Sequence, residues 1–303
     1  MTEKLLANNP EFLFRKMIQQ KNSFIFTVTA GRSGQASLAN LFRKHVFNCY
    51  PAFEEPQIHY YFPVFLNNIE RRFRRRFIET HELLGRGKIL TAFELGNDLY
   101  LKNIAECRIR KATRTLNKED LSIYVDISKY FARGLHRGFA QLLPSFSLIR
   151  LVRDPLLNMK SFLNRKKDFL LDNSSPDRAS NILRIDSSNF SSGEFYLWAW
   201  CEMYLRFDKI IQDYNVKKFV EIRTENLANP EYIESAFNTL ELPYSPVQST
   251  PPLNTNVAQG LEKTLVTKED IIIFNNFLNR LPSETMDQII YFSDYQPELI
   301  HNL

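Results

Sequence analysis

The chain has few of the residues that would mark a secreted, disulfide-stabilised protein. It contains three cysteines among 303 residues. Because Cys49, Cys107 and Cys201 are odd in number and widely spaced, they form neither a disulfide framework nor a metal-binding motif. We therefore predict a protein of a reducing compartment, with a cytoplasmic location.

Long hydrophobic runs are also absent from the N-terminal sequence MTEKLLANNPEFLFRKMIQQKN. It predicts neither a signal peptide nor a membrane anchor, but a short amphipathic lead-in helix over residues 1–22. The composition is 44% hydrophobic with 25 phenylalanines and a net charge of +5, which suits a large buried core. Since no internal repeat or linker divides the chain, we treat residues 1–303 as a single domain.

Glycine is scarce, with nine in the whole chain, so the close spacing of Gly31 and Gly34 indicates a specific structural or functional requirement. The apolar run Phe24–Val28 predicts a buried strand, and apolar residues at helical spacing from Leu38 predict a helix. A strand, a glycine turn and a helix leave N–H groups at the helix start without partners, and an anion such as phosphate satisfies them. The alternative interpretation is an ordinary strand-to-helix turn.

The nucleoside-triphosphate loop GxxxxGK[ST] is absent. Only two residues separate Gly31 from Gly34, and Gln35 and Ala36 stand where Lys and Ser/Thr would be. The cation, Arg32, lies inside the turn instead. This pattern favours a phosphate or sulfate group bound without a metal, and it argues against a kinase of the P-loop class.

The rest of the chain predicts strands alternating with helices, hence a three-layer α/β fold with a parallel central sheet between helices. The ligands of such sheets bind beyond the carboxyl ends of the strands, where Arg32, Lys129 and Arg153 would collect. A helical insert is expected over about 60–117 and a flexible polar loop over 168–192. Further strands are predicted at 49–53, 88–93, 121–128, 147–152 and 218–222, and helices at 60–84, 98–117, 130–143, from 155, 193–214 and 230–240.

A second anion cradle is predicted at the end of the 147–152 strand, which is followed directly by Arg153. Asp154 is suited to cap the next helix. In that helix Asn158, Ser161 and Arg165 are spaced to share one face. The alternative is a routine capped helix with a surface arginine.

Three segments resemble the sulfotransferases. TAGRSGQASLANLF resembles the 5′-phosphosulfate loop of the members that carry RSGxT, and LIRLVRDPLLNMKSFLNR resembles the family's 3′-phosphate motif. FVEIRTENLANPEYIESAFNTLELP is similar to the segment usually written RYEDL, with Thr224 and Asn226 in place of Tyr and Asp. The segments occur in family order and span residues 24–242.

The resemblance implies a P-loop-like α/β fold and the cofactor 3′-phosphoadenosine 5′-phosphosulfate, without a metal. Adenosine 3′,5′-bisphosphate would be the product. The hydroxyl residues that follow SG in the family are absent here, so the loop N–H groups, Arg32 and Ser37 would supply the 5′-phosphate contacts. The implied cofactor-binding residues are Gly31, Arg32, Ser33, Gly34, Gln35, Ala36, Ser37, Arg153, Ser161 and Arg165.

The catalytic residues are also implied by resemblance, in this case to tyrosylprotein and carbohydrate sulfotransferases. A Gly-Glu-Glu element about two dozen residues after the loop arginine holds the tyrosylprotein enzymes' base, and Phe53-Glu54-Glu55-Pro56 stands in that place. Glu55 is the first choice as general base, and Lys129 and Arg32 would stabilise the leaving phosphate. The carboxylates could instead be merely solvated. Other candidate bases are Glu54, His59 and, more remotely, Glu94.

The leading hypothesis is therefore a metal-independent sulfotransferase acting on a hydroxyl or amine of a small molecule, lipid, glycan or peptide. The alternative is a non-catalytic nucleotide- or polyanion-binding protein that uses the basic block Arg71–Arg76. That block also suits a solvated helix face, and no nucleic-acid fold signature accompanies it, so no nucleic-acid partner is expected.

Overall fold

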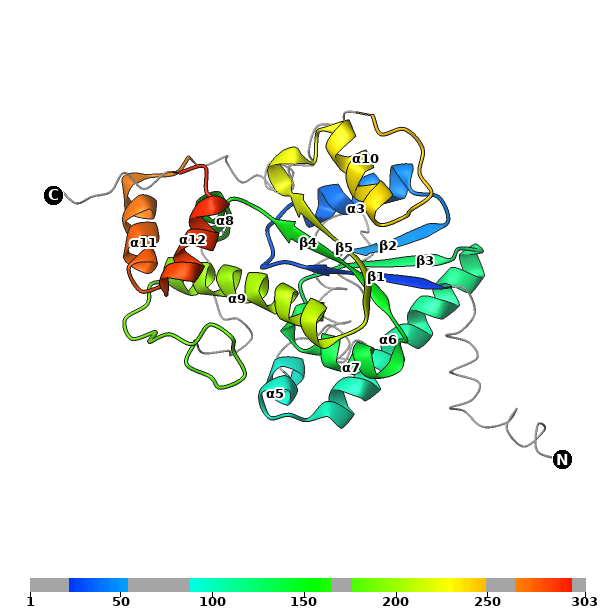
Figure 1. Ribbon diagram of the computed structural model, residues 1–303, viewed down its shortest axis with the longest axis horizontal. Helices are drawn as coiled ribbons and strands as arrows, with labels where there is room; N and C mark the ends of the chain where they lie inside the picture. Colours follow the sequence, from blue (N-terminus) through cyan, green and yellow to red (C-terminus); the bar gives the residue numbers. More distant parts are fainter. Residues whose placement is uncertain (1–21, 54–87, 165–175, 249–264, 296–303) are drawn as a thin grey trace, which may run out of the picture.

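A computed structural model describes residues 22–53, 88–164, 176–248 and 265–295. At their centre lies a sheet of five strands in the order β2-β3-β1-β4-β5 (Figure 1). All neighbouring strands pair in parallel, so the predicted α/β fold with a parallel central sheet is confirmed. The strands are β1 (Ser23–Val28), β2 (Cys49–Phe53), β3 (Ile123–Ile127), β4 (Phe146–Val152) and β5 (Val216–Arg223).

Strand β1 runs through the middle of the sheet and is buried on both faces. Phe24 and Phe26 belong to the hydrophobic core on one face, and Ile25 belongs to the core on the other. Because a central strand of a parallel sheet has no solvated face, its sequence is almost continuously apolar. The two cores place the carboxyl end of β1 in the interior of the molecule.

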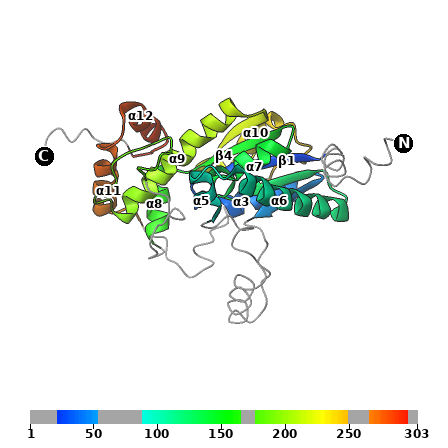
Figure 2. The same cartoon turned by 90° about the horizontal axis from the view of Figure 1, so that it is seen from below.

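Helices cover both faces of the sheet, which gives three layers (Figures 1 and 2). Each face of the sheet packs against its helices in a separate hydrophobic core, the first on the face of Phe24 and Phe26 and the second on the face of Ile25. The first core takes residues from α5 (Lys88–Glu94), α6 (Asp98–Glu119), α7 (Leu135–Leu142) and α9 (Ser192–Asp213), and the second from α3 (Gln35–His45) and α10 (Pro230–Thr239).

Three further helices lie beyond the carboxyl ends of the strands (Figure 1). They are α8 (Pro155–Leu163), α11 (Lys268–Leu278) and α12 (Ser283–Tyr291). The Lys160 ammonium of α8 lies 2.7 Å from the carboxylate of Asp270 in α11, and both side chains are largely buried. A second ion pair joins Arg280 to Glu194 of α9 at 3.3 Å. The C-terminal helices are thereby fixed next to the end of β4.

The predicted strand at 88–93 is wrong, because these residues form α5. A short apolar run does not distinguish a strand from a buried helix. Here Ile89 and Ala92, three residues apart, both pack into the first core. The predicted helix at 130–143 is interrupted: a 3₁₀ turn, η2 (Phe131–Arg133), ends at Gly134, whose φ of 134° favours glycine.

The other described elements agree with the predicted types. The helix at 98–117 is α6, Trp198 and Trp200 are buried in the core, and residues 176–191 of the predicted polar loop contain no helix or strand. The helices predicted at 1–22 and 60–84, including Arg71–Arg76, fall almost entirely outside the described residues, as does much of the predicted helical insert.

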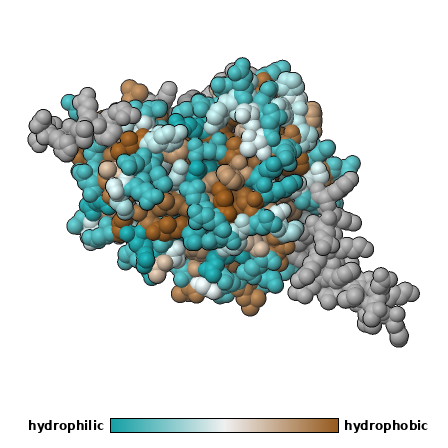
Figure 3. Space-filling model, viewed as in Figure 1, coloured by the Kyte–Doolittle hydropathy of each residue, from teal (hydrophilic) through white to brown (hydrophobic). Residues whose placement is uncertain are grey.

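Hydrophilic residues dominate the face shown in Figure 3, with apolar residues visible between them. Within the described ranges, every helix is too short or too polar to cross a bilayer.

Because α7 closely approaches α6, we expect alanine to be much more destabilising at Gly138 of α7 than at Gly193 of α9. A Cβ at Gly138 would overlap the backbone carbonyl of Leu101, whereas one at Gly193 would meet only side-chain atoms, Ile273 Cγ2 at 2.7 Å and Met159 Sδ at 3.0 Å. We expect Gly138→Ala to lower the free energy of unfolding by about 1–3 kcal/mol despite the better helix propensity of alanine.

Gly193→Ala is the matched control, and we expect it to lower the free energy of unfolding less, since side chains yield to a new methyl group more easily than the backbone of a neighbouring helix does. Urea unfolding of both variants measures the difference. Equal effects would contradict the proposed backbone contact.

Candidate functional site

The loop Thr29–Gly34 follows β1 at the centre of the sheet's carboxyl edge. Strand β1 pairs with β3 on one side and β4 on the other, so the chain order diverges there. Such a divergence is where parallel α/β sheets bind ligands. The loop has left-handed backbone at Gly31 (φ 98°), Arg32 (φ 60°) and Gly34 (φ 75°).

Side chains from other parts of the fold hold the loop's carbonyl groups. Three consecutive carbonyls each accept a hydrogen bond from a different side chain, so these oxygens are turned toward protein. The N–H of each of these peptide units, which belongs to Arg32, Ser33 or Gly34, points opposite to its carbonyl, as in anion-binding turns, whereas Gly31 N donates to Thr29 Oγ1 at 3.3 Å. The bonds run from Tyr196 Oη to Gly31 O (2.6 Å), from Arg153 Nη1 to Arg32 O (3.2 Å) and from Thr224 Oγ1 to Ser33 O (2.9 Å).

The start of α3 lacks the groups that normally satisfy a helix N-terminus. Its N-cap is Gly34, which has no side chain to accept a hydrogen bond, and its first turn contains no acidic residue. By contrast, α6, α9 and α11 each begin with a side-chain cap and an acidic residue. The first-turn N–H groups of a helix have no partners within the helix, so an anion at α3 would both accept their hydrogen bonds and complement the dipole.

Glycine is required at position 34 by close packing as well as by backbone conformation. A Cβ there would lie 2.8 Å from Leu227 Cδ1 and 2.9 Å from Thr224 Cγ2. The turn after β5 therefore presses directly against the loop.

The buried side chain of Asn158 joins α8 to the same loop. It lies 3.1 Å from Ser33 Oγ, and both side chains are almost fully buried. When its amide is oriented to suit its neighbours, its nitrogen donates to Gly31 O at 3.2 Å and Arg32 O at 3.1 Å. Asn158 thus fixes the predicted second cradle against the first.

The predicted cations of the site lie together around the loop. A Cβ on Gly31 would be 3.5 Å from Lys129 Cδ, and Arg153 contacts the Arg32 carbonyl. Burial raises the pKa of the Tyr196 phenol, and the charges of Arg153, Arg32 and Arg133 oppose that rise. The loop therefore lies in a region of positive potential.

Asp154 caps α8 as predicted, with Leu157 N donating to Oδ1 at 2.7 Å. Its second oxygen accepts a hydrogen bond from Asp294 N, also at 2.7 Å, so the segment after α12 is tied to the turn that carries Arg153. Burial raises the pKa of Asp154 above its ordinary value. Ser161 is buried further along α8.

Several predicted residues lie outside the described part of the chain: Glu54, Glu55, His59 and Arg165. Glu94 ends α5, and its Oε1 is buried without a hydrogen-bond partner among the residues that the structure describes.

Reasoning from the sequence missed the part that Tyr196 plays in the site. Its hydrogen bond spans 165 positions along the chain. The only local signal was a tyrosine on the apolar face of a predicted helix, which does not distinguish a loop anchor from a core residue.

No family model matches the chain, and no curated protein matches it. Among the described residues, no group of three or more His, Cys, Asp or Glu side chains could hold a metal ion.

The packing of Thr224 predicts that its hydroxyl stabilises the loop. Its Oγ1 lies 2.9 Å from both Ser33 O and Val152 O. Thr224→Val keeps the shape but removes the donor, so we expect the free energy of unfolding to fall by about 1–3 kcal/mol. Urea unfolding measures the loss.

Thr239→Val provides the control, because Thr239 also donates to a backbone carbonyl at 2.9 Å but at an exposed position. Its effect should be much smaller. If Thr239→Val lowered the free energy of unfolding as much as Thr224→Val does, the contact of Thr224 with the loop would contribute no more than an exposed hydrogen bond.

Proposed function

We propose that the protein is a sulfotransferase that moves a sulfuryl group from 3′-phosphoadenosine 5′-phosphosulfate to a hydroxyl or amine. The observation that carries the proposal is the loop at the start of α3, whose carbonyls are held by Tyr196, Arg153 and Thr224. A helix N-terminus with no side-chain cap and no acidic first turn suits a phosphate, and Arg32 supplies a cation within the loop itself.

The residues present fit a ligand with two separated phosphate-bearing positions. Backbone N–H groups of the loop and α3, together with Arg32, would bind the 5′-phosphosulfate. Arg153 and Ser161 would bind the 3′-phosphate with Arg165, which lies outside the described residues. Asn158 and Arg153 contact the loop directly, which supports one continuous site for the two groups of donors.

When bound, the phosphosulfate supplies an activated sulfuryl group and a phosphate leaving group. The acceptor oxygen or nitrogen forms a bond to sulfur as the bond from sulfur to the bridging phosphate oxygen breaks. Arg32 and Lys129 would stabilise the negative charge that develops on the leaving phosphate. Glu55 would take the acceptor proton as general base.

The proposal predicts tight binding of adenosine 3′,5′-bisphosphate in the presence of EDTA, because both phosphates are bound by protein donors. ATP lacks the 3′-phosphate, and the chain lacks the Lys-Ser/Thr pair of a nucleoside-triphosphate loop. Titration calorimetry with each ligand measures the two affinities, and we expect the bisphosphate to bind more tightly.

Arg32→Met should weaken bisphosphate binding by about tenfold or more, since a charge-assisted contact is lost. Arg43→Met is the matched control, because Arg43 is exposed at the opposite end of α3 and should not affect binding.

In the comparison of the two ligands, ATP binding as tightly as the bisphosphate would contradict the proposed cofactor.

The proposal also predicts that Glu55→Gln lowers turnover by about 10²–10⁴-fold, the usual contribution of a general base. The substitution keeps the side chain's shape while removing its basic site. Bisphosphate affinity should hardly change. Transfer of radiolabelled sulfate to a panel of acceptors measures turnover. If Glu55→Gln keeps normal turnover while Glu54→Gln or His59→Asn loses it, the general base is Glu54 or His59 instead.

A further inference from the structure

The turn after β3, residues 128–134, carries Lys129 to the candidate anion loop. A Cβ on Gly31 would lie 3.5 Å from Lys129 Cδ, so the aliphatic part of the lysine lies beside the loop. Its ammonium group is close to Cδ in the side chain, so the charge is near the loop as well. Strand β3 pairs in parallel with β1, so the turn and the loop leave the sheet at the same edge. The position of this charge therefore depends on the conformation of the turn.

Two consecutive carbonyls of the turn are held by buried side chains. The first is Phe131 O, which lies 3.3 Å from His136 Nδ1. The second is Ala132 O, which accepts a hydrogen bond from Arg206 Nη1 at 2.9 Å. Burial and the charge of Arg206 lower the pKa of His136 to about 3, so its ring is neutral and can donate from Nδ1. The turn is thus held as the anion loop is, by side chains that bind its carbonyls.

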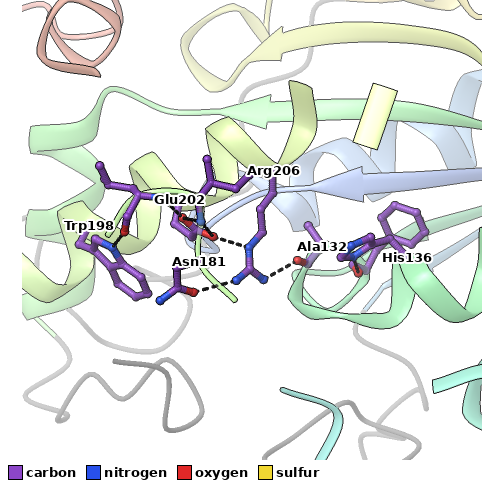
Figure 4. Close-up of polar contacts among 9 residues, drawn as sticks. Ala132, His136, Asn181, Trp198, Glu202 and Arg206 are labelled. Carbon is purple, nitrogen blue, oxygen red and sulfur yellow. Dashed lines mark hydrogen bonds and ion pairs between the residues drawn. The ribbon is translucent and has the colours of Figure 1, made fainter. Parts of the chain in front are cut away.

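Arg206 is itself held by an ion pair within α9 (Figure 4). Its Nε donates to Glu202 Oε1 at 2.6 Å, and its Nη2 donates to Asn181 Oδ1 at 3.0 Å. Both side chains of the ion pair are almost fully buried. The carboxylate of Glu202 also accepts from Ile182 N at 3.1 Å and from Leu183 N at 2.8 Å. These contacts fix the planar guanidinium in the orientation that reaches the turn.

Helix α9 holds the loop and the turn at the same time. Near its start, Tyr196 donates to Gly31 O at 2.6 Å, and further along the helix Arg206 donates to Ala132 O. The ring of Phe93 in α5 packs against the guanidinium, with its centroid 4.8 Å from Arg206 Cζ. One helix therefore sets the spacing between the anion loop and the turn that brings a lysine to it.

We propose that Arg206 and Glu202 are positioning residues of the candidate site, which hold the turn so that Lys129 lies against the anion loop. The inference rests on the proposed function, which gives Lys129 an anionic ligand to stabilise. The pair does not touch the ligand itself, since its groups are buried and bind protein partners. It acts on the ligand through the lysine, so its removal should matter only while Lys129 is present.

A double-mutant cycle tests the inference, because residues that act through one another have non-additive effects. The proteins to compare are the unchanged chain, Lys129→Met, the pair variant Glu202→Gln with Arg206→Met, and all three substitutions combined. The pair variant removes both charges together, so it leaves no unpaired charge in the core. Calorimetry with inorganic pyrophosphate in EDTA measures the affinity of each protein.

We expect Lys129→Met to weaken pyrophosphate binding by about tenfold or more, since a charge-assisted contact is lost. The pair variant should weaken it by about threefold or more. In the Lys129→Met background, the pair substitutions should cause no further loss. An equal further loss in that background would overturn the inference, because the pair would then support the fold in general. Normal affinity in Lys129→Met or in a folded pair variant would also overturn it.

Asp208→Asn with Arg150→Met is the matched control, because these residues form another ion pair between α9 and the sheet, at 3.0 Å. Arg150 lies on β4 and also pairs with Glu221 of β5. The control should bind pyrophosphate as the unchanged protein does. Urea unfolding of each variant separates a loss of binding from a loss of fold. A control that loses as much affinity as the pair variant would overturn the inference.

If the pair variant fails to fold, Arg206→Lys decides in the same cycle. It keeps the charge opposite Glu202 but loses the planar fork that reaches Ala132 O. It must weaken pyrophosphate binding measurably with Lys129 present and not in the Lys129→Met background, and any other result would overturn the inference.

The same ligands separate this inference from the proposed function. If the unchanged protein binds pyrophosphate without preferring adenosine 3′,5′-bisphosphate to ATP, the proposed cofactor is wrong while the pyrophosphate affinities still judge the pair. If the unchanged protein binds neither pyrophosphate nor the bisphosphate, both proposals are wrong.

Discussion

Three hydrogen bonds to the carbonyls of Gly31, Arg32 and Ser33 fix the conformation of the loop at the centre of the sheet's carboxyl edge. A peptide loop whose oxygens are held by protein donors offers its N–H groups to a ligand, and such a loop before an uncapped helix attracts an anion. The donors come from α9, from the end of β4 and from the turn after β5. The site is therefore made by the whole fold and not by the glycine loop alone.

The arginine at the end of β4 shows how tightly the surrounding structure controls the site. The carbonyl of Arg153 accepts a hydrogen bond from Trp200 Nε1 at 3.0 Å, and the next residue, Asp154, is bound by Leu157 N and Asp294 N. Helix α9 and the segment after α12 thus fix the backbone that carries the Arg153 side chain. They thereby help to position the short turn that we propose binds a phosphate.

The sequence predicted the features that depend on neighbouring residues. The apolar run before Gly31, the glycine spacing and the Asp154 cap are local patterns, and the structure has β1, the loop and α8 where they were expected. The prediction of a strand at 88–93 was wrong. The run is helical because Ile89 and Ala92 pack against the core, which its local periodicity does not reveal. The role of Tyr196 was missed because its contact with the loop spans 165 positions and arises only when α9 packs beside the loop.

Hydrogen–deuterium exchange with and without adenosine 3′,5′-bisphosphate tests whether the loop binds the ligand, because it reports on the backbone N–H groups themselves. We expect the ligand to slow exchange most strongly in peptides covering residues 29–38, with weaker protection near residues 153–161. Glycine-loop amides that bind a phosphate become hydrogen-bonded, so their exchange must slow. Binding without protection at 29–38 would contradict the claim that this loop is the anion site.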